Sequence, residues 1–411
     1  MLSKTLTNIA RSGAFAVGAG LNITRDAIAD CLGRSVPYAP ERFLTPAHLS
    51  EMLNRYAVGP VVNRIEIDSV RSLDIRSTSS NCNNVVVELE QAGEAVLPDQ
   101  LFIKLPMADL GTRWFFDVIG SWQLEAYFCR HVAQHVPLRT PKTYASFSER
   151  TRFFLVQENL HQDPEVQLFT NMNMVDGPPL DIVYRCLDAF AQLHACHFGL
   201  DAAQRSKILP LDNHPFLGTR MRYVSQTLNA QGLAPCVRQC GDLIPGKTID
   251  LYKQTLKNWD SLLAHWFDGP LSLLHGDSHI GNFFVAGEQM GMLDFQAVHW
   301  GKGVRDVQYF LIDTLPVELL ERHEQEFVRY YVERRAVYGE AVDFDQVWDD
   351  YRGFSYHTLM TIVVSIGFGA LNDEHGPLMR DILQRAVAAL DRVDYAGWLQ
   401  GRLNKPIHLK K

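Results

Sequence analysis

The stretch of sequence that decides the fold lies in the last third of the chain, and it has two parts. The first covers residues 273–284 and reads Leu273-Leu274-His275-Gly276-Asp277-Ser278-His279-Ile280-Gly281-Asn282-Phe283-Phe284; the second covers residues 292–296 and reads Met292-Leu293-Asp294-Phe295-Gln296. Asn282 follows Asp277 by five positions, and Asp294 follows Asn282 by twelve. Apolar runs flank these polar residues, which predicts buried strands that support them.

Asp277, Asn282 and Asp294 carry the groups that phosphoryl transfer requires. One carboxylate orients the attacking hydroxyl and accepts its proton, while an amide oxygen and a second carboxylate hold Mg²⁺ against the phosphates of a nucleotide. The step from Asp277 to Asn282 puts the base and a metal ligand on one loop. We therefore predict Asp277 as the catalytic base, Asn282 and Asp294 as metal ligands, and ATP with Mg²⁺ as cofactors. His279 is a second candidate catalytic residue, which either faces the transferred phosphate or packs.

The two-part stretch resembles the aminoglycoside phosphotransferase/choline kinase superfamily, and its Asp-Phe-Gln ending is similar to the ecdysteroid-kinase-like branch. The resemblance covers roughly residues 45–395. It implies an α+β, protein-kinase-like fold with a small β-rich N-lobe and a larger, mainly helical C-lobe. It also implies that Asp306 is buried and braces the catalytic loop. We expect His275 to be structural and to hydrogen-bond the backbone near Asp294.

The N-lobe should supply the nucleotide-binding groups. Lys104 ends the apolar run 101–104, and a lysine there costs desolvation free energy unless an anion meets it. By resemblance, Lys104 binds the α- and β-phosphates and pairs with a helix glutamate, for which Glu125 is the best candidate. Residues Glu158, Asn159 and Leu160 resemble the hinge segment, whose backbone would meet adenine.

The loop over the phosphates departs from the protein-kinase pattern. Between Gly59 and Gly93 the chain contains no glycine, and a polar run of Ser, Thr and Asn stands there instead. Asparagine tolerates unusual backbone angles, and serine hydroxyls can donate to phosphate. We predict that this run contacts the nucleotide through Ser79, Ser80 and Asn81.

The pattern along the chain predicts three regions: an N-terminal helical extension over 1–44, a nucleotide-binding N-lobe over 45–159, and a C-lobe over 160–411 with the catalytic loop and the acceptor site. Helices are expected over 47–57, 116–135 and 180–197. Strands are expected over 62–67, 70–75, 84–90, 101–105, 142–147 and 152–158. Apolar runs at 271–274, 282–285 and 290–295 interrupt an otherwise helical C-lobe.

Composition excludes several classes of protein. The chain has 411 residues, of which 46% are hydrophobic and 21% charged, and its formal net charge is −8. A nucleic-acid partner is not expected, because binding phosphate backbones needs clustered Lys and Arg. The seven cysteines show no CxxC spacing, which predicts reduced thiols and a cytoplasmic location. The acid-free first 25 residues also leave an organellar transit peptide open.

Two segments raise the question of a membrane. Residues 353–372 lack Asp, Glu, Lys and Arg, but they contain His357 and several Ser, Thr and Gly residues. We predict a buried helix and no membrane span. The N-terminal segment, with Lys4, Arg11 and Arg25, is interpreted as an amphipathic helix that lies on the domain or on a partner.

Three alternatives to the kinase hypothesis stay open. His275, Asp277 and His279 could form the metal cluster of a metallophosphoesterase, with residues 212–214 as a distant partner. Ser278 could be a nucleophile, although the G-x-S-x-G elbow is absent. The chain could also be a nucleotide-binding module without turnover.

The acceptor side is expected to be apolar. The apolar residues expected there are Met360, Ile362, Val363, Val364, Ile366 and Phe368 within 356–371, and Met221, Tyr223 and Trp259 within 214–266. An apolar pocket with few charges predicts a hydrophobic alcohol, sterol-like or acyl-type, as the small-molecule acceptor. A cationic acceptor of the aminoglycoside or choline type is the alternative. The sequence leaves the acceptor's identity and the oligomeric state open.

Overall fold

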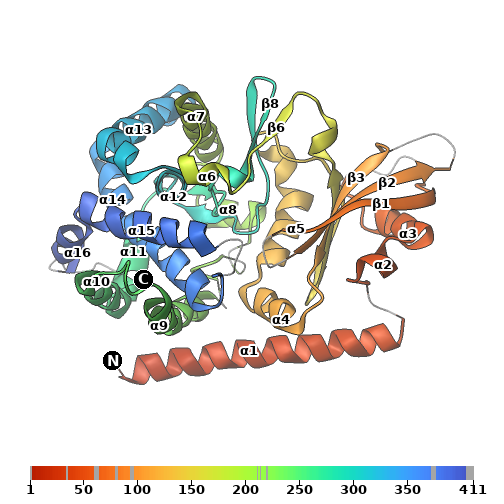
Figure 1. Cartoon of the computed structure of the whole chain (residues 1–411), viewed down its shortest axis with the longest axis horizontal. Helices are drawn as coiled ribbons and strands as arrows, with labels where there is room; N and C mark the ends of the chain where they lie inside the picture. Colours follow the sequence, from red (N-terminus) through yellow and green to blue (C-terminus); the bar gives the residue numbers. More distant parts are fainter. Residues whose placement is uncertain are drawn as a thin grey trace.

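The computed structural model of the chain describes residues 2–33, 36–59, 64–78, 82–92, 97–210, 212, 214–218, 221–371 and 376–403. Figure 1 shows a β-sheet body beside a larger helical body, with one long helix running beneath both. The predicted α+β, two-lobe, kinase-like fold is confirmed. The region boundaries near residues 44 and 159 stay predictions.

The N-lobe is built on one antiparallel sheet in the order β1-β2-β3-β5-β4. Its strands are β1 (Ile67–Thr78), β2 (Cys82–Gln91), β3 (Gln100–Pro106), β4 (Thr143–Glu149) and β5 (Arg152–Glu158). On the central strand β3, Ile103 lies opposite Val85 on one side and Val156 on the other, and all three are fully buried. Residues 67–78 form one strand where the sequence predicted two, over 62–67 and 70–75; residues 62 and 63 lie outside the described part.

The helix expected over 116–135 is a second error in the N-lobe. The structure has α4 (Leu110–Ile119), α5 (Ser121–His131) and the short η2 (Ala133–His135). Gly120 separates α4 from α5 with a left-handed φ of 78° and caps α4 through its N–H. Glycine adopts this conformation without the steric cost that a Cβ brings, so the chain turns here although the apolar spacing continues.

The C-lobe packs around α12 (Val304–Thr314), all of whose residues are buried. Around it lie α13 (Val317–Val337), α14 (Phe344–Gly367) and α15 (Gly376–Arg392). The other helices of the described C-lobe are α6 (Asn173–Asp176), α7 (Leu180–Cys196), α8 (Ala202–Ile208), α9 (Met221–Cys240), α10 (Gly246–Lys257), α11 (Trp259–Trp266) and α16 (Tyr395–Leu403). The apolar segment 353–372 therefore lies mostly within α14, as a buried helix. No described helix is long and apolar enough to cross a membrane.

Short strands in the C-lobe carry the two-part stretch. The strands β7 (Ser272–Leu274) and β10 (His299–Gly301) pair with each other, and β6 (Val166–Leu168), β8 (Phe283–Ala286) and β9 (Gln289–Met292) form a second small sheet. The single turns η3 (Leu160–Gln162) and η5 (Ile280–Asn282) precede β6 and β8. The three apolar runs predicted to interrupt the helical pattern are thus strands.

The N-terminal helix α1 (Leu2–Cys31) lies against α4 of the N-lobe and α9 of the C-lobe (Figure 1). Asn22 donates to Asp117 on α4 at 2.9 Å, and Ser12 donates to the Tyr223 carbonyl on α9 at 3.2 Å. The interpretation of this segment as a helix that rests on the domain is confirmed. After it, α2 (Pro40–Phe43) and α3 (Pro46–Arg55) cover one face of the large sheet.

Candidate active site

The loop between β7 and β8 holds Asp277 in a turn that glycine makes possible. Gly276 has a φ of 90°, and a Cβ there would lie 2.0 Å from the Ala297 carbonyl oxygen. Only glycine fits so close to a backbone oxygen. Asn282 closes the loop, because its Nδ2 donates to the Asp277 carbonyl at 2.7 Å.

Asp306 braces this loop from α12. Its carboxylate accepts the backbone N–H groups of His275 at 2.7 Å and of Gly276 at 3.1 Å, and it is fully buried. Burial alone would raise the pKa of Asp306, but the His194 hydrogen bond and the Arg305 charge outweigh burial and hold it below its usual value. The predicted brace is confirmed, and so is the structural role of His275, whose Nε2 lies 2.9 Å from the Leu293 carbonyl oxygen.

Both carboxylate oxygens of Asp277 accept hydrogen bonds. Tyr309 Oη donates to Oδ1 at 3.3 Å, and Gln296 Nε2 donates to Oδ2 at 3.2 Å. His279 Nε2 lies 4.0 Å from Oδ1, so the two candidate catalytic residues face each other. Burial would raise the pKa of Asp277, but His279, His275 and the Gln296 hydrogen bond outweigh it and hold the pKa below the usual value. Asp277 is therefore ionised at neutral pH.

A β-hairpin brings Asn282 and Asp294 together across twelve residues of sequence. Phe283 pairs with Met292 across β8 and β9, and the Leu293 N–H donates to the Asn282 carbonyl at 3.0 Å. Asp294 follows with a left-handed φ of 64°, a strained conformation of the kind that clusters at functional sites. Among the described residues, both hydrogen bonds of the Asn282 side chain use its nitrogen, so its oxygen can take a cation. An amide oxygen beside a carboxylate is a donor set that fits Mg²⁺.

Lys104 connects the two lobes. Its Nζ lies 2.9 Å from both carboxylate oxygens of Glu125 on α5 and 2.9 Å from Asp294 Oδ1. Lys104 and Glu125 are buried in the N-lobe, whereas Asp294 belongs to the C-lobe. Burial opposes the charge of Lys104, but the carboxylates of Asp294 and Glu125 outweigh it and hold the pKa of Lys104 well above its usual value.

The three hinge residues line a cavity together with Lys104 and Asp294. The Glu158 carboxylate points to Arg139 (2.5 and 2.7 Å), and the Asn159 amide donates to Gln100 at 3.1 Å. Leu160 is buried. The side chains of Glu158 and Asn159 are thus occupied by the protein, which leaves the backbone as the part of the hinge that a ligand can meet. Ser79, Ser80 and Asn81 lie outside the described residues.

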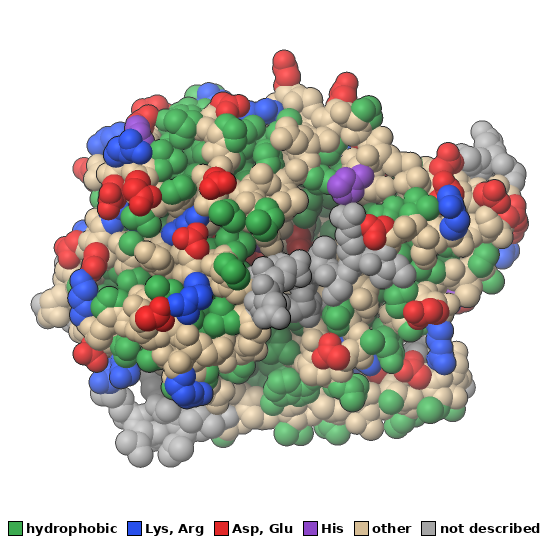
Figure 2. Space-filling model, in the orientation of Figure 1, with side chains coloured by type: hydrophobic (Ala, Val, Ile, Leu, Met, Phe, Trp, Pro, Cys, Tyr) green, Lys and Arg blue, Asp and Glu red, His purple; other side chains and the backbone are tan. Residues whose placement is uncertain are grey.

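Figure 2 shows a hollow near the middle of one face, with acidic side chains deep inside it. Two cavities of the C-lobe meet at Asp277 and Tyr309. Of the residues expected on the acceptor side, these cavities are lined by Met221, Met360, Ile362 and Val364. Phe368 is about half exposed instead, and Val363, Ile366 and Trp259 are buried in the core of the C-lobe. Tyr223 lies against α1.

Sequence reasoning missed Tyr309 and Asp313 as site residues. Both stand on α12 with Asp306, at spacings of three and seven residues that place all three on one helix face. That spacing was the available signal. Asp313 lines a cavity with Asp277, and its Oδ1 is buried without a hydrogen-bond partner among the described residues. The hydroxyl of Ser278 is also buried and donates to the Asp306 carbonyl at 2.9 Å, which disfavours the nucleophile alternative.

The buried carboxyl of Asp313 should make stability depend on pH. Burial and the charge of Asp277 raise the pKa of Asp313 to about 8, whereas an unfolded Asp ionises near pH 4. Folding therefore favours the protonated form of Asp313. The contribution of this form to the free energy of unfolding is full below about pH 4 and is lost as the pH rises from there through 8. We expect Asp313→Asn to gain stability relative to the wild type between pH 5 and 8. Melting curves recorded over this pH range measure the gain. The control Asp345→Asn, at an exposed position, should show no pH-dependent gain in melting temperature.

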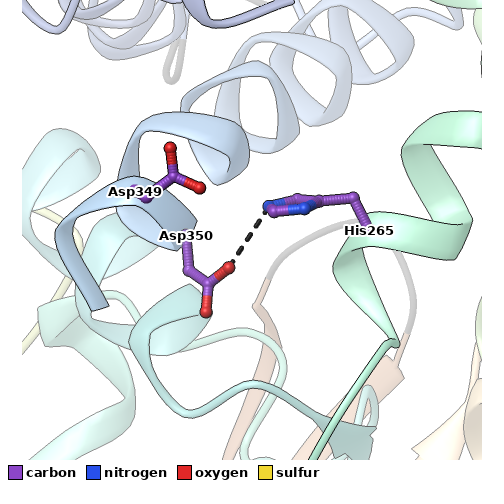
Figure 3. A group of neighbouring side chains, drawn as sticks. All are labelled: His265, Asp349 and Asp350. Carbon is purple, nitrogen blue, oxygen red and sulfur yellow. Dashed lines mark ion pairs between the residues drawn. The ribbon is translucent and has the colours of Figure 1, made fainter. Parts of the chain in front are cut away.

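One further group of side chains has metal-ligand character. His265 on α11 and Asp349 and Asp350 on α14 lie together, as Figure 3 shows. His265 Nε2 is 3.2 Å and Lys302 Nζ is 2.7 Å from Asp350 Oδ1, and Arg402 pairs with Asp349. Basic side chains of the protein already balance both carboxylates, so this group is an internal ion-pair cluster.

The chain resembles several solved structures at low sequence identity. The choline kinase from Cryptosporidium parvum Iowa II is 12% identical, with a TM-score of 0.45, over 82% of this chain and 90% of that one. A choline/ethanolamine kinase family protein from Mesorhizobium loti is 14% identical, with a TM-score of 0.45, over 80% and 92%. The streptomycin–ATP–APH(2″)-IIa ternary complex is 12% identical, with a TM-score of 0.44, over 89% and 97%. No curated protein sequence matches the chain.

A match to a family model shows which protein family the chain belongs to. The model APH, described as the phosphotransferase enzyme family, matches residues 120–341, which include α5, the catalytic loop, the β8–β9 hairpin and α12. The match covers more than half of the 411 residues. The chain therefore belongs to the phosphotransferase enzyme family, whose members use a nucleoside triphosphate with metal ions, and is a small-molecule kinase.

Proposed function

We propose that the protein transfers the γ-phosphate of ATP, bound with Mg²⁺, to a hydroxyl of a small hydrophobic molecule. The observation that carries this proposal is the arrangement around Asp277. This ionised carboxylate lies where apolar-walled cavities meet, and the loop that holds it ends at Asn282, beside Asp294 and Lys104.

In this proposal Asp277 is the catalytic base. Tyr309 and Gln296 hold both of its oxygens, which fixes the carboxylate in one orientation toward the cavity. A positioned base accepts the proton of the acceptor hydroxyl as the oxygen attacks phosphorus. We propose that His279, whose Nε2 lies 4.0 Å from Asp277 Oδ1, faces the transferred phosphate.

The remaining polar residues hold the nucleotide. Asn282 and Asp294 are the proposed Mg²⁺ ligands, and the bound cation would neutralise charge on the transferred phosphoryl group. Lys104, which Glu125 aligns, is proposed to bind the α- and β-phosphates. The backbone of Glu158, Asn159 and Leu160 is proposed to meet adenine, and residues 79–81 are proposed to cover the phosphates.

The cavity walls support an apolar acceptor. Apolar side chains of α14 and α15 border Asp277 on one side, and Phe216 with residues of α9 borders it on the other. The Asp-Phe-Gln sequence over 294–296 supports the ecdysteroid-kinase-like branch, and its Gln296 side chain donates to Asp277. One observation favours a cationic acceptor as the second candidate: the ionised Asp277 carboxylate and the Asp313 carboxyl line the same cavity.

The experiment that tests the proposal incubates the protein with ATP, Mg²⁺ and a library of hydroxylated metabolites and reads new phosphorylated masses. Phosphorylation of neutral apolar alcohols is the expected result. Products confined to amines or quaternary ammonium compounds would favour the cationic alternative. Nucleotide binding without any product over a broad library would favour a binding module.

Filling the cavity should separate acceptor binding from nucleotide binding. Thr361 lines both cavities beside Asp277, so Thr361→Trp places an indole where the acceptor should lie. We expect transfer to fall about tenfold or more, because overpacking excludes the acceptor. Affinity for Mg·ATP, measured by calorimetry, should stay unchanged. Thr361→Val, which nearly keeps the volume, is the matched control, and unaltered transfer in the Trp variant would reject the acceptor site.

A further inference from the structure

A large cavity of about 640 Å³ lies in the N-lobe, between the end of α1, the helices α2 and α3, and the turn that joins β4 to β5. Ligand sites are commonly of this size. Arg152, the first residue of β5, lines this cavity, whereas Glu158, the last residue of the same strand, lines the nucleotide cavity. A seven-residue strand spans about 20 Å, so the two cavities are separate.

Arg152 is buried in the wall of the cavity with most of its hydrogen-bonding capacity unused. Only 2% of the residue is exposed. Its Nη2 pairs with Asp30, and its Nε lies 3.9 Å from Asp26 Oδ2, beyond hydrogen-bond distance. Nε and Nη1 are buried with no hydrogen-bond partner among the described residues. Such donors cost free energy unless an acceptor meets them.

Aromatic stacking fixes the guanidinium in place. The ring of Tyr38 lies between two arginines, with the Cζ atoms of Arg113 and Arg152 each 4.4 Å from its centroid. Burial and the nearby Arg152 charge lower the pKa of Arg113. A rigid, positively charged centre with free N–H groups is suited to an oxyanion.

The other charges on the wall leave room for an anion. Each of the three carboxylates that line the cavity already faces an arginine: Asp30 faces Arg152, Glu51 faces Arg55 and Glu149 faces Arg150. Arg42 lines the same cavity and has no carboxylate partner among the described residues. His48 adds a further buried nitrogen, Nε2, that is unpartnered within the described part of the chain.

We infer that this cavity binds a small organic anion, whose carboxylate or phosphate group meets the free N–H groups of Arg152 and whose apolar or aromatic body packs against Tyr38, Tyr56 and Phe147. Charge-assisted hydrogen bonds to a guanidinium supply the affinity, and the aromatic wall selects for the body of the ligand. The site is distinct from the nucleotide and acceptor cavities and does not depend on the reaction proposed above.

Calorimetric titration of the full chain with phenyl phosphate, benzoate or inorganic phosphate tests the inference. A non-hydrolysable ATP analogue with Mg²⁺ is kept at saturation, so that the nucleotide cavity is filled. We expect saturable binding of phenyl phosphate or benzoate, tighter than that of inorganic phosphate. If phenyl phosphate binds best, the ligand is a phosphate ester; if benzoate binds best, it is a carboxylate. No saturable binding of any probe at millimolar concentration, or binding that the ATP analogue abolishes, would overturn the inference.

Variants at Arg152 assign the binding to this cavity. Arg152→Met should weaken binding by about 10- to 100-fold, the loss expected for hydrogen bonds to a charged group. Arg152→Lys keeps the charge beside Asp26 and Asp30 but loses the planar fork, so it tests the site even if the Met variant fails to fold. Arg71→Met removes an exposed arginine of β1 that does not line the cavity and should change binding less than twofold. Wild-type affinity in Arg152→Lys would reject Arg152 as the anion-binding group.

Discussion

Replacing Asp277 by asparagine should lower the turnover of phosphate transfer by about 10²–10⁴, the contribution of a general base. The amide keeps the shape of the side chain and can still accept from Tyr309, but it has no basic oxygen to take the proton of the acceptor hydroxyl. Affinity for Mg·ATP should persist, since Lys104, Asn282 and Asp294 are unchanged. Single-turnover transfer and calorimetry measure the two quantities separately.

Asp268→Asn is the matched control for this experiment. Asp268 is exposed just before β7, so the variant makes the same chemical change in the same region without touching the cavity. Its turnover should equal that of the wild type. A metallophosphoesterase would instead lose a bound transition metal on Asp277→Asn and would hydrolyse phosphate esters without a nucleotide. Near wild-type transfer to an alcohol in Asp277→Asn would refute the proposed base.

Replacing Asp294 by asparagine should weaken Mg²⁺-dependent nucleotide binding by about 10- to 100-fold or more, the range seen when a group that supports a metal site is lost. The substitution removes a negative charge from the cation site and one of the two carboxylates that pair with Lys104. Lys104 keeps Glu125, so the fold should survive. Titration with ATP in the presence and absence of Mg²⁺ measures the effect.

The control for Asp294 is Glu288→Gln, which makes the same charge change at the exposed tip of the β8–β9 hairpin. Its affinity for Mg·ATP should be unaltered, and both variants should melt within a few degrees of the wild type. If Asp294→Asn binds Mg·ATP as tightly as the control does, Asp294 is not a metal ligand.

The sequence by itself determined the two-lobe architecture and most of the residues that meet in the cleft. The two-part stretch was sufficient for this, because Asp277, Asn282 and Asp294 stand at spacings that a short loop and a hairpin convert directly into proximity. Lys104 was found because a lysine in an apolar strand needs a nearby anion, and the structure supplies two. Their roles in catalysis stay predictions until the variants are measured.

Apolar periodicity could not reveal where helices break or which polar residues of a buried helix face the site. Apolar periodicity predicted one helix where the structure has α4 and α5, because the apolar spacing continues through Gly120. The backbone conformation of Gly120 ends α4 there. It also gave no distinction among the polar residues of α12, since all of that helix is buried.

The tertiary structure alone decided the role of α12 and of the N-terminal helix. Tyr309 and Asp313 join Asp277 only because α12 packs under the catalytic loop. The helix α1 lies across both lobes because Ala19 packs with Val118 of α4 and Val224 of α9, and because Asn22 and Ser12 hydrogen-bond to the same two helices. The cavity at Arg152 joins residues that are more than 100 positions apart in the chain. Hydrophobic patterns specify which residues are buried, whereas the partners of buried charges depend on contacts between distant segments, which no local pattern encodes.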